Sequence, residues 1–129
     1  MTTTPPTPVA TRTIASAFVT DVICILLFVA VGRRNHAEGV TVAGVAQTAW
    51  PFLAGLVAAW VVYRAWRRPT TISPTGVSIW LTTIAAGMVL RAAIGAGIAI
   101  SFILVATTVT GMLLLGWRAI VAGLARRPG

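Results

Sequence analysis

The sequence predicts an all-α integral membrane protein, a bundle of four transmembrane helices with the N and C termini in the cytoplasm. Hydrophobic residues make up 57% of the 129 residues and charged residues only 9%, a composition well outside that of soluble domains. From Thr75 to Trp117 the only charge is Arg91, in a stretch long enough for two crossings of about 20 residues each. Apolar runs of this length indicate helices, because barrel strands show a short alternating pattern.

The first predicted span covers residues 14–31 and follows a segment rich in threonine and proline. Residues 1–12 carry one charge and are expected to form a disordered cytoplasmic tail. Arg12, an apolar run and "AVG" at 30–32 also resemble a cleavable signal peptide. Asp21 argues against this alternative because it interrupts a region that is continuous in signal peptides. We therefore expect the segment to be retained as a span.

The transmembrane domain is expected to comprise residues 13–118, with its other spans at residues 43–62, 74–94 and 97–117. Ser73 is placed to cap a helix that begins at Pro74, a position that suits a residue without an N–H. The sequence "RRP" at 67–69 marks the preceding helix as finished. Residues 119–129 are expected to form a basic cytoplasmic tail.

All ten basic residues are arginines, and their positions predict the orientation. Across four alternating spans, seven fall on the side of the termini and three on the other: Arg12, Arg64, Arg67, Arg68, Arg118, Arg126 and Arg127 against Arg33, Arg34 and Arg91. Cytoplasmic loops carry the excess of basic residues, which predicts cytoplasmic termini in the cell membrane. Despite a net charge of +8, arginines at span ends predict contact with the lipid bilayer and argue against nucleic acid as a partner.

The segment "GRRNHAEG" at 32–39 is the first candidate site, on the predicted outer face. With Arg91 it supplies five candidate ligand-binding residues: Arg33, Arg34, His36, Glu38 and Arg91. Guanidinium groups bind phosphate or carboxylate in bidentate fashion, so the cluster suits an anion, while Glu38 could instead pair with an arginine. The alternative is that Arg33 and Arg34 extend to lipid headgroups and that His36 is a solvated loop residue.

Arg91 lies near the membrane edge, because "IGAG" at 94–97 predicts a tight turn between the third and fourth spans. Small residues recur every four positions on its helical face: Thr83, Gly87 and Gly95. Such residues permit close helix approach, so Arg91 is expected to face the bundle. Three roles stay open for it: locking helices through backbone carbonyls or Glu38, contacting a ligand, or extending to the interface.

Asp21 is the second candidate, because acidic residues inside a membrane span are rare. Counting helical rise places four threonines at a similar depth, which allows a hydroxyl cluster around it: Thr82, Thr83, Thr107 and Thr108. Arg118, at the inner edge, is long enough to approach the carboxylate. A neutral Asp21 would donate a hydrogen bond or relay protons, whereas pairing with a cation would make it a structural pin. Trp60 reads as a packing or interface residue, and Trp117 as an interface residue near the inner side.

The ordered motifs resemble a family of small prokaryotic membrane proteins known as the domain of unknown function three-zero-five-four. The resemblance covers nearly the whole chain after the first dozen residues. It rests on Asp21, "GRRNH" at 32–36, "WPF" at 50–52, Trp60, Trp80, "GMVLR" at 87–91, "SF" at 101–102 and "GWR" at 116–118. It implies four helical spans and no established activity.

These observations favour a non-catalytic membrane protein that binds a partner protein, an anionic lipid or another anionic ligand at the outer cluster. The alternative is a small oligomeric transporter or channel that uses Asp21 as a proton or cation relay. An enzyme is not expected, because two acids, one histidine and Cys24 provide no catalytic or metal-binding constellation. No cofactor is expected either, and homo-oligomerisation or a membrane partner stays open.

Overall fold

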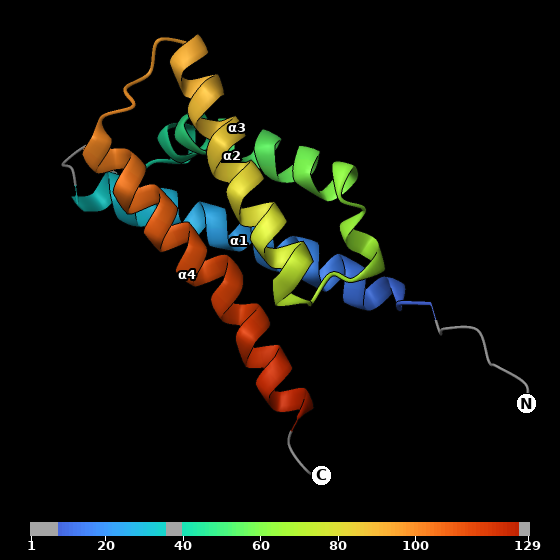
Figure 1. Ribbon diagram of the computed structural model, residues 1–129. Helices are drawn as coiled ribbons and strands as arrows, with labels where there is room; N and C mark the ends of the chain where they lie inside the picture. Colours follow the sequence, from blue (N-terminus) through green and yellow to red (C-terminus); the bar gives the residue numbers. More distant parts are fainter. Residues whose placement is uncertain (1–7, 36–39, 127–129) are drawn as a thin grey trace, which may run out of the picture.

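The computed structural model describes residues 8–35 and 40–126, most of which lie in four long helices (Figure 1). The helices are α1 Thr11–Asn35, α2 Val42–Val62, α3 Val77–Ala93 and α4 Ile100–Ala125. Each is long and apolar enough to cross a membrane. For α3 this span includes the preceding turn and covers Ile72–Ala93. The predicted all-α class with four membrane-spanning helices is confirmed.

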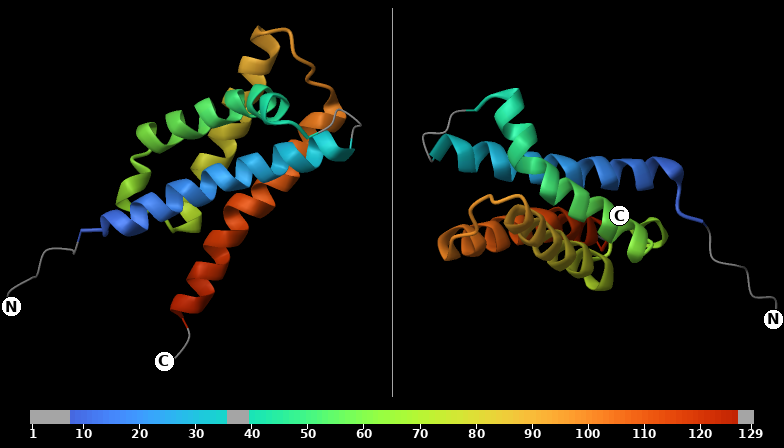
Figure 2. Two further views of the ribbon diagram at one scale, coloured as in Figure 1. Left: turned by 180° about the vertical axis from the view of Figure 1, so that it is seen from behind. Right: turned by 90° about the horizontal axis from the view of Figure 1, so that it is seen from above.

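Helix α2 packs against α1 and α3, while α4 packs against α3 and returns to α1. The N-terminal end of α1, the α2–α3 connection and the C-terminal end of α4 lie toward one end of the bundle, and the α3–α4 connection lies at the other (Figures 1 and 2). We call these the inner and the outer end, following the orientation predicted from the arginines. Near the inner end α4 diverges from the other helices (Figure 1).

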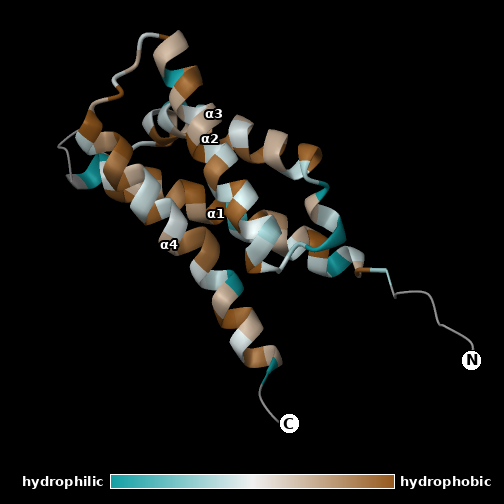
Figure 3. Cartoon of the chain, viewed as in Figure 1, coloured by the Kyte–Doolittle hydropathy of each residue, from teal (hydrophilic) through white to brown (hydrophobic). Residues whose placement is uncertain are grey.

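The outward surface of the helices is apolar, as a bilayer requires. Exposed side chains within the spans include Val19, Leu81 and Leu104. In Figure 3 the helices are mainly brown and white, with teal at several helix ends and connections and in one band within the lower half of α4. The buried core is also apolar, with Ile25, Phe52 and Leu56 fully buried between helices. Polar groups inside the bundle are therefore few, and each needs a partner from another helix or from the backbone.

Glycines set the close approach of α2 to α3, the face that the sequence predicted to be an interface. A side chain at Gly87 would collide with the ring of Phe52, and one at Gly55 would lie 3.1 Å from the carbonyl oxygen of Thr83. On α4, Gly111 accommodates the indole of Trp80, whose Nε1 donates to the carbonyl oxygen of Thr107 at 2.9 Å. In a membrane such packing and interhelical hydrogen bonds hold helices together.

The third helix is preceded by a turn that the sequence did not predict. Ser73 has extended φ and ψ of −123° and 134°, as the residue before a helix does, and is joined to Pro74 by a cis peptide. The chain forms a wide turn over Ile72–Gly76 in which the Gly76 N–H donates to the Thr71 carbonyl at 3.0 Å, and α3 begins only at Val77. This turn packs against the side chain of Arg118, an interaction that local sequence rules do not include.

The limits of the fourth helix also differ from those predicted. It begins at Ile100 rather than 97 and continues to Ala125 rather than ending at 117. The predicted C-terminal tail therefore starts as helix. In place of a tight turn at 94–97, Gly95 adopts a φ of 77° and Ala96 N–H donates to the Arg91 carbonyl at 2.8 Å, and the chain then runs without regular structure to Ala99.

Candidate functional site

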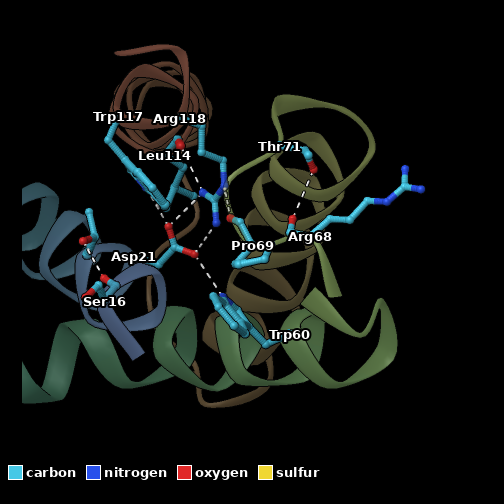
Figure 4. A network of polar contacts seen from close by, with 10 residues as sticks. Ser16, Asp21, Trp60, Arg68, Pro69, Thr71, Leu114, Trp117 and Arg118 are labelled. Atoms are coloured by element: carbon cyan, nitrogen blue, oxygen red, sulfur yellow. Dashed lines mark hydrogen bonds and ion pairs between the residues drawn. The ribbon is translucent and has the colours of Figure 1, made fainter. Parts of the chain in front are cut away.

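A buried polar network surrounds Asp21, and its side chains come from three helices (Figure 4). The Asp21 carboxylate is fully buried and accepts four hydrogen bonds. Trp117 Nε1 and Arg118 Nη1 donate to Oδ1, each at 2.9 Å. Trp60 Nε1 and Arg118 Nη2 donate to Oδ2 at 3.0 and 2.8 Å. An ionised carboxylate only accepts hydrogen bonds, so four N–H donors match that form of the side chain.

Arg118 is as buried as its partner and forms a bidentate ion pair with Asp21. Its Nε donates to the Pro69 carbonyl in the α2–α3 connection at 3.0 Å, and its Nη1 donates to the Leu114 carbonyl one turn earlier in α4 at 3.0 Å. The guanidinium also lies over the Trp117 ring, 4.4 Å from its centroid. Such extra hydrogen bonds are what a buried ion pair needs to offset the desolvation of two charges.

The network therefore ties α1, α2, α4 and the α2–α3 connection together at one point near the inner end. Arg118 contacts Asp21, which agrees with the expectation that its side chain is long enough to approach the carboxylate. A proton relay needs an oxygen that can take up and release a proton, and here both oxygens are occupied by N–H donors. The geometry favours the structural pin. It also makes α1 an integral part of the bundle.

The four threonines do not form the expected hydroxyl cluster around Asp21. Thr82 donates to the Tyr63 hydroxyl at 3.1 Å, and Thr107 donates to the Ile103 carbonyl in its own helix at 2.7 Å. Thr108 is exposed on α4. Thr83 is fully buried, and its hydroxyl has no hydrogen-bond partner among the described residues. Equal depth along the helix axes did not bring these side chains together, because rotation about each axis turns them to other faces.

A second candidate site is a cavity of about 360 Å³ at the outer end, which we call the outer cavity. All four helices and the α3–α4 connection contribute to its lining, which includes Phe28, Arg33, Thr48, Arg91, Ser101 and Phe102. Phe28 and Phe102 also pack with Phe52 in an aromatic cluster, with ring centroids 5.8 to 6.2 Å apart. The cavity thus combines two cations and two hydroxyl groups with an aromatic wall.

Backbone and hydroxyl contacts hold both cavity arginines. Arg33 Nη1 donates to the Thr48 hydroxyl at 3.1 Å, and its guanidinium lies directly against Gly44. Arg91 donates from Nε and Nη2 to the Gly97 carbonyl at 3.0 and 2.7 Å and lies over the Phe102 ring, 4.4 Å from its centroid. Arg91 therefore joins the end of α3 to the α3–α4 connection through a backbone carbonyl.

The structure brings together only part of the predicted outer cluster. Arg33 and Arg91, which come from α1 and α3, line the same cavity, as the predicted hairpin implied. Arg34 is exposed and is not part of the cavity lining. His36 and Glu38 lie outside the described residues.

A family model described as a protein of unknown function, DUF3054, matches residues 18–121. The chain belongs to this family. Comparisons with curated proteins and with solved structures found no match. The DUF3054 segment contains Asp21 and all of its side-chain donors, and also Arg33 and Arg91. Membership of this family and the four apolar helices together indicate a multi-pass membrane protein of unknown function.

Two residues of the DUF3054 segment have roles that sequence reasoning missed. Trp60 and Trp117 were interpreted as packing or interface residues, yet both donate to Asp21. A signal was present, because a buried indole N–H usually finds an acceptor and Asp21 is the strongest acceptor in the spans.

Proposed function

We propose that this protein is a non-catalytic protein of the cell membrane that binds an anionic ligand in the outer cavity. The observation that carries the proposal is the convergence of Arg33 and Arg91 on one cavity from different helices. Two guanidinium groups present several N–H donors in a fork geometry suited to phosphate or carboxylate. Thr48 and Ser101 add hydroxyl groups to the same lining.

The orientation is part of the proposal. An excess of arginines at the inner end supports a cytoplasmic position for that end and a position of the cavity on the outer side of the membrane. The location near the end of the spans suits an anion, because its charge meets two cations in surroundings less polar than water, where the attraction is stronger.

The test is thermal unfolding of the purified protein in nanodiscs of zwitterionic lipid, with inorganic phosphate and with dodecyl phosphate as two separate anionic probes. A ligand at about 100 times its Kd stabilises a protein by about 2.7 kcal/mol. We expect at least one probe to raise the midpoint of the wild type. Arg33→Gln and Arg91→Gln should abolish that rise, whereas Arg34→Gln, which changes an exposed arginine next to the cavity, should keep it.

A structural role for Arg91 gives a different result. Because it bonds to the Gly97 carbonyl, Arg91→Gln should also lower the midpoint without ligand. If the basal midpoint falls but the ligand-induced rise persists, Arg91 only holds the connection. If neither probe changes the wild-type midpoint, or if Arg34→Gln behaves like Arg33→Gln, the proposal is wrong.

A further inference from the structure

The outer cavity changes from polar to apolar along the membrane normal. On α1, Val29 lies one helical turn deeper than Arg33, about 6 Å by helical rise. Helix α4 runs in the opposite direction, so Val105 lies about 6 Å deeper than Ser101. The end of the cavity near the membrane surface therefore holds the charges, and the deep end is a hydrocarbon wall.

The cavity is also open on one side of the bundle. Its α1 lining at Phe28 and Val29 is buried, whereas its α4 lining at Val105 is 53% exposed and Ser101 is exposed as well. At Gly32 an added Cβ would meet no atom within 4 Å. An exposed valine within a membrane-spanning helix faces lipid, so the opening beside α4 leads to the bilayer.

We infer that the occupant is a single-chain anionic amphiphile taken from the outer leaflet. Its phosphate or carboxylate head lies between Arg33 and Arg91, and its chain follows Val29 and Val105 toward the middle of the membrane. A volume of about 360 Å³ is near the lower limit of ligand pockets, roughly 300–1,000 Å³, which suits a small head and one chain segment rather than a whole two-chain lipid. This inference rests on the proposed function and narrows the ligand class.

The test separates head recognition from chain recognition with the two anionic probes, in the same zwitterionic nanodiscs. Val105→Trp fills the apolar wall and leaves both arginines in place. It should weaken the binding of dodecyl phosphate at least tenfold, measured from the shift of the unfolding midpoint with the mole fraction of probe in the membrane. Leu104→Trp is the matched control, because Leu104 is exposed on the same helix and is not part of the lining.

A second variant guards against misfolding of Val105→Trp. Gly32→Leu adds a side chain from the opposite wall, where the structure has space for it, and should weaken dodecyl phosphate binding in the same way. Dodecanol at the same mole fraction lacks the charged head and should leave the midpoint unchanged.

The possible results distinguish this inference from the proposed function. If inorganic phosphate stabilises the wild type and the wall variants bind dodecyl phosphate normally, the cavity binds a free anion and the inference is overturned while the proposed function stands. Stabilisation by dodecanol equal to that by dodecyl phosphate also overturns it, because the head is then not recognised. If neither anionic probe binds, both proposals fail.

Discussion

Replacing Asp21 by asparagine should remove a large part of the stability of this protein. The change keeps the size of the side chain, but one of its two oxygens becomes an NH2 group that donates and cannot accept. The NH2 group then faces two N–H donors and no acceptor. These donors are either Trp60 Nε1 and Arg118 Nη2 or Trp117 Nε1 and Arg118 Nη1. Arg118 also keeps its charge in a fully buried position without a counter-ion.

The structure allows the size of this effect to be worked out. Removing one partner of a buried ion pair costs about 3–5 kcal/mol, because an uncompensated charge is left behind. Total free energies of unfolding are only about 5–15 kcal/mol, so Asp21→Asn should remove a large share of the stability of the protein. Trp60→Phe removes a single hydrogen bond to a charged group and should cost less, about 1.5–3 kcal/mol.

The assay is equilibrium unfolding in mixed micelles by titration with sodium dodecyl sulfate, followed by tryptophan fluorescence. A double-mutant cycle with Arg118→Gln isolates the pair: the double variant should be less destabilised than the sum of the single variants by about 0.5–3 kcal/mol. Arg126→Gln, which changes an exposed arginine at the end of α4, should stay within about 0.5 kcal/mol of the wild type. A cost below about 1 kcal/mol for Asp21→Asn, or strict additivity in the cycle, would refute the assignment of Asp21 and Arg118 as a structural pin.

Three further predictions use the same titration. Trp80→Phe should cost about 0.5–1.5 kcal/mol because the Thr107 carbonyl loses its indole donor, whereas Trp50→Phe, at a ring that is 42% exposed, should have little effect. Gly87→Ala should cost about 1–3 kcal/mol through collision with the Phe52 ring, while Gly123→Ala, where a Cβ meets no atom within 4 Å, should be neutral or stabilising. Arg64→Gly should stabilise by up to about 1.5 kcal/mol, because relief of the left-handed φ of 51° gains about 1–2 kcal/mol and the greater freedom of glycine in the unfolded chain costs about 0.4–1 kcal/mol. Arg67→Gly should destabilise, and equal effects of the two would contradict this reasoning.

The fold was predictable because the bilayer leaves the backbone little choice. Long apolar runs must satisfy their own N–H and C=O groups, so they form helices, and four such runs were visible in the sequence. Composition did not determine where helices end. Ser73 and Pro74 carry the local pattern of a helix start, and the structure has a wide turn over Ile72–Gly76, packed against Arg118, before α3 begins at Val77.

The candidate sites were predictable in part. Asp21, Arg33, Arg91 and Arg118 stood out because charges are scarce in the spans, and the predicted topology brought them to the correct ends. What could not be predicted was the rotation of each helix about its axis, which depends on how side chains interlock. That rotation turns Trp60 toward Asp21 and leaves Thr108 on the surface.

The Asp21–Arg118 pair has a consequence for biosynthesis, because its two members are separated by 97 residues in the chain. At a translation rate of about 5–20 residues per second, the ribosome makes Arg118 roughly 5–20 s after Asp21. During that interval α1 carries its acid in the insertion machinery or the bilayer without its cation. Asp21 in the first helix can therefore gain its counter-ion only when the last helix, which carries Arg118, has been made. A nascent chain truncated before Trp117 lacks this pair and should be a substrate for membrane quality-control proteases.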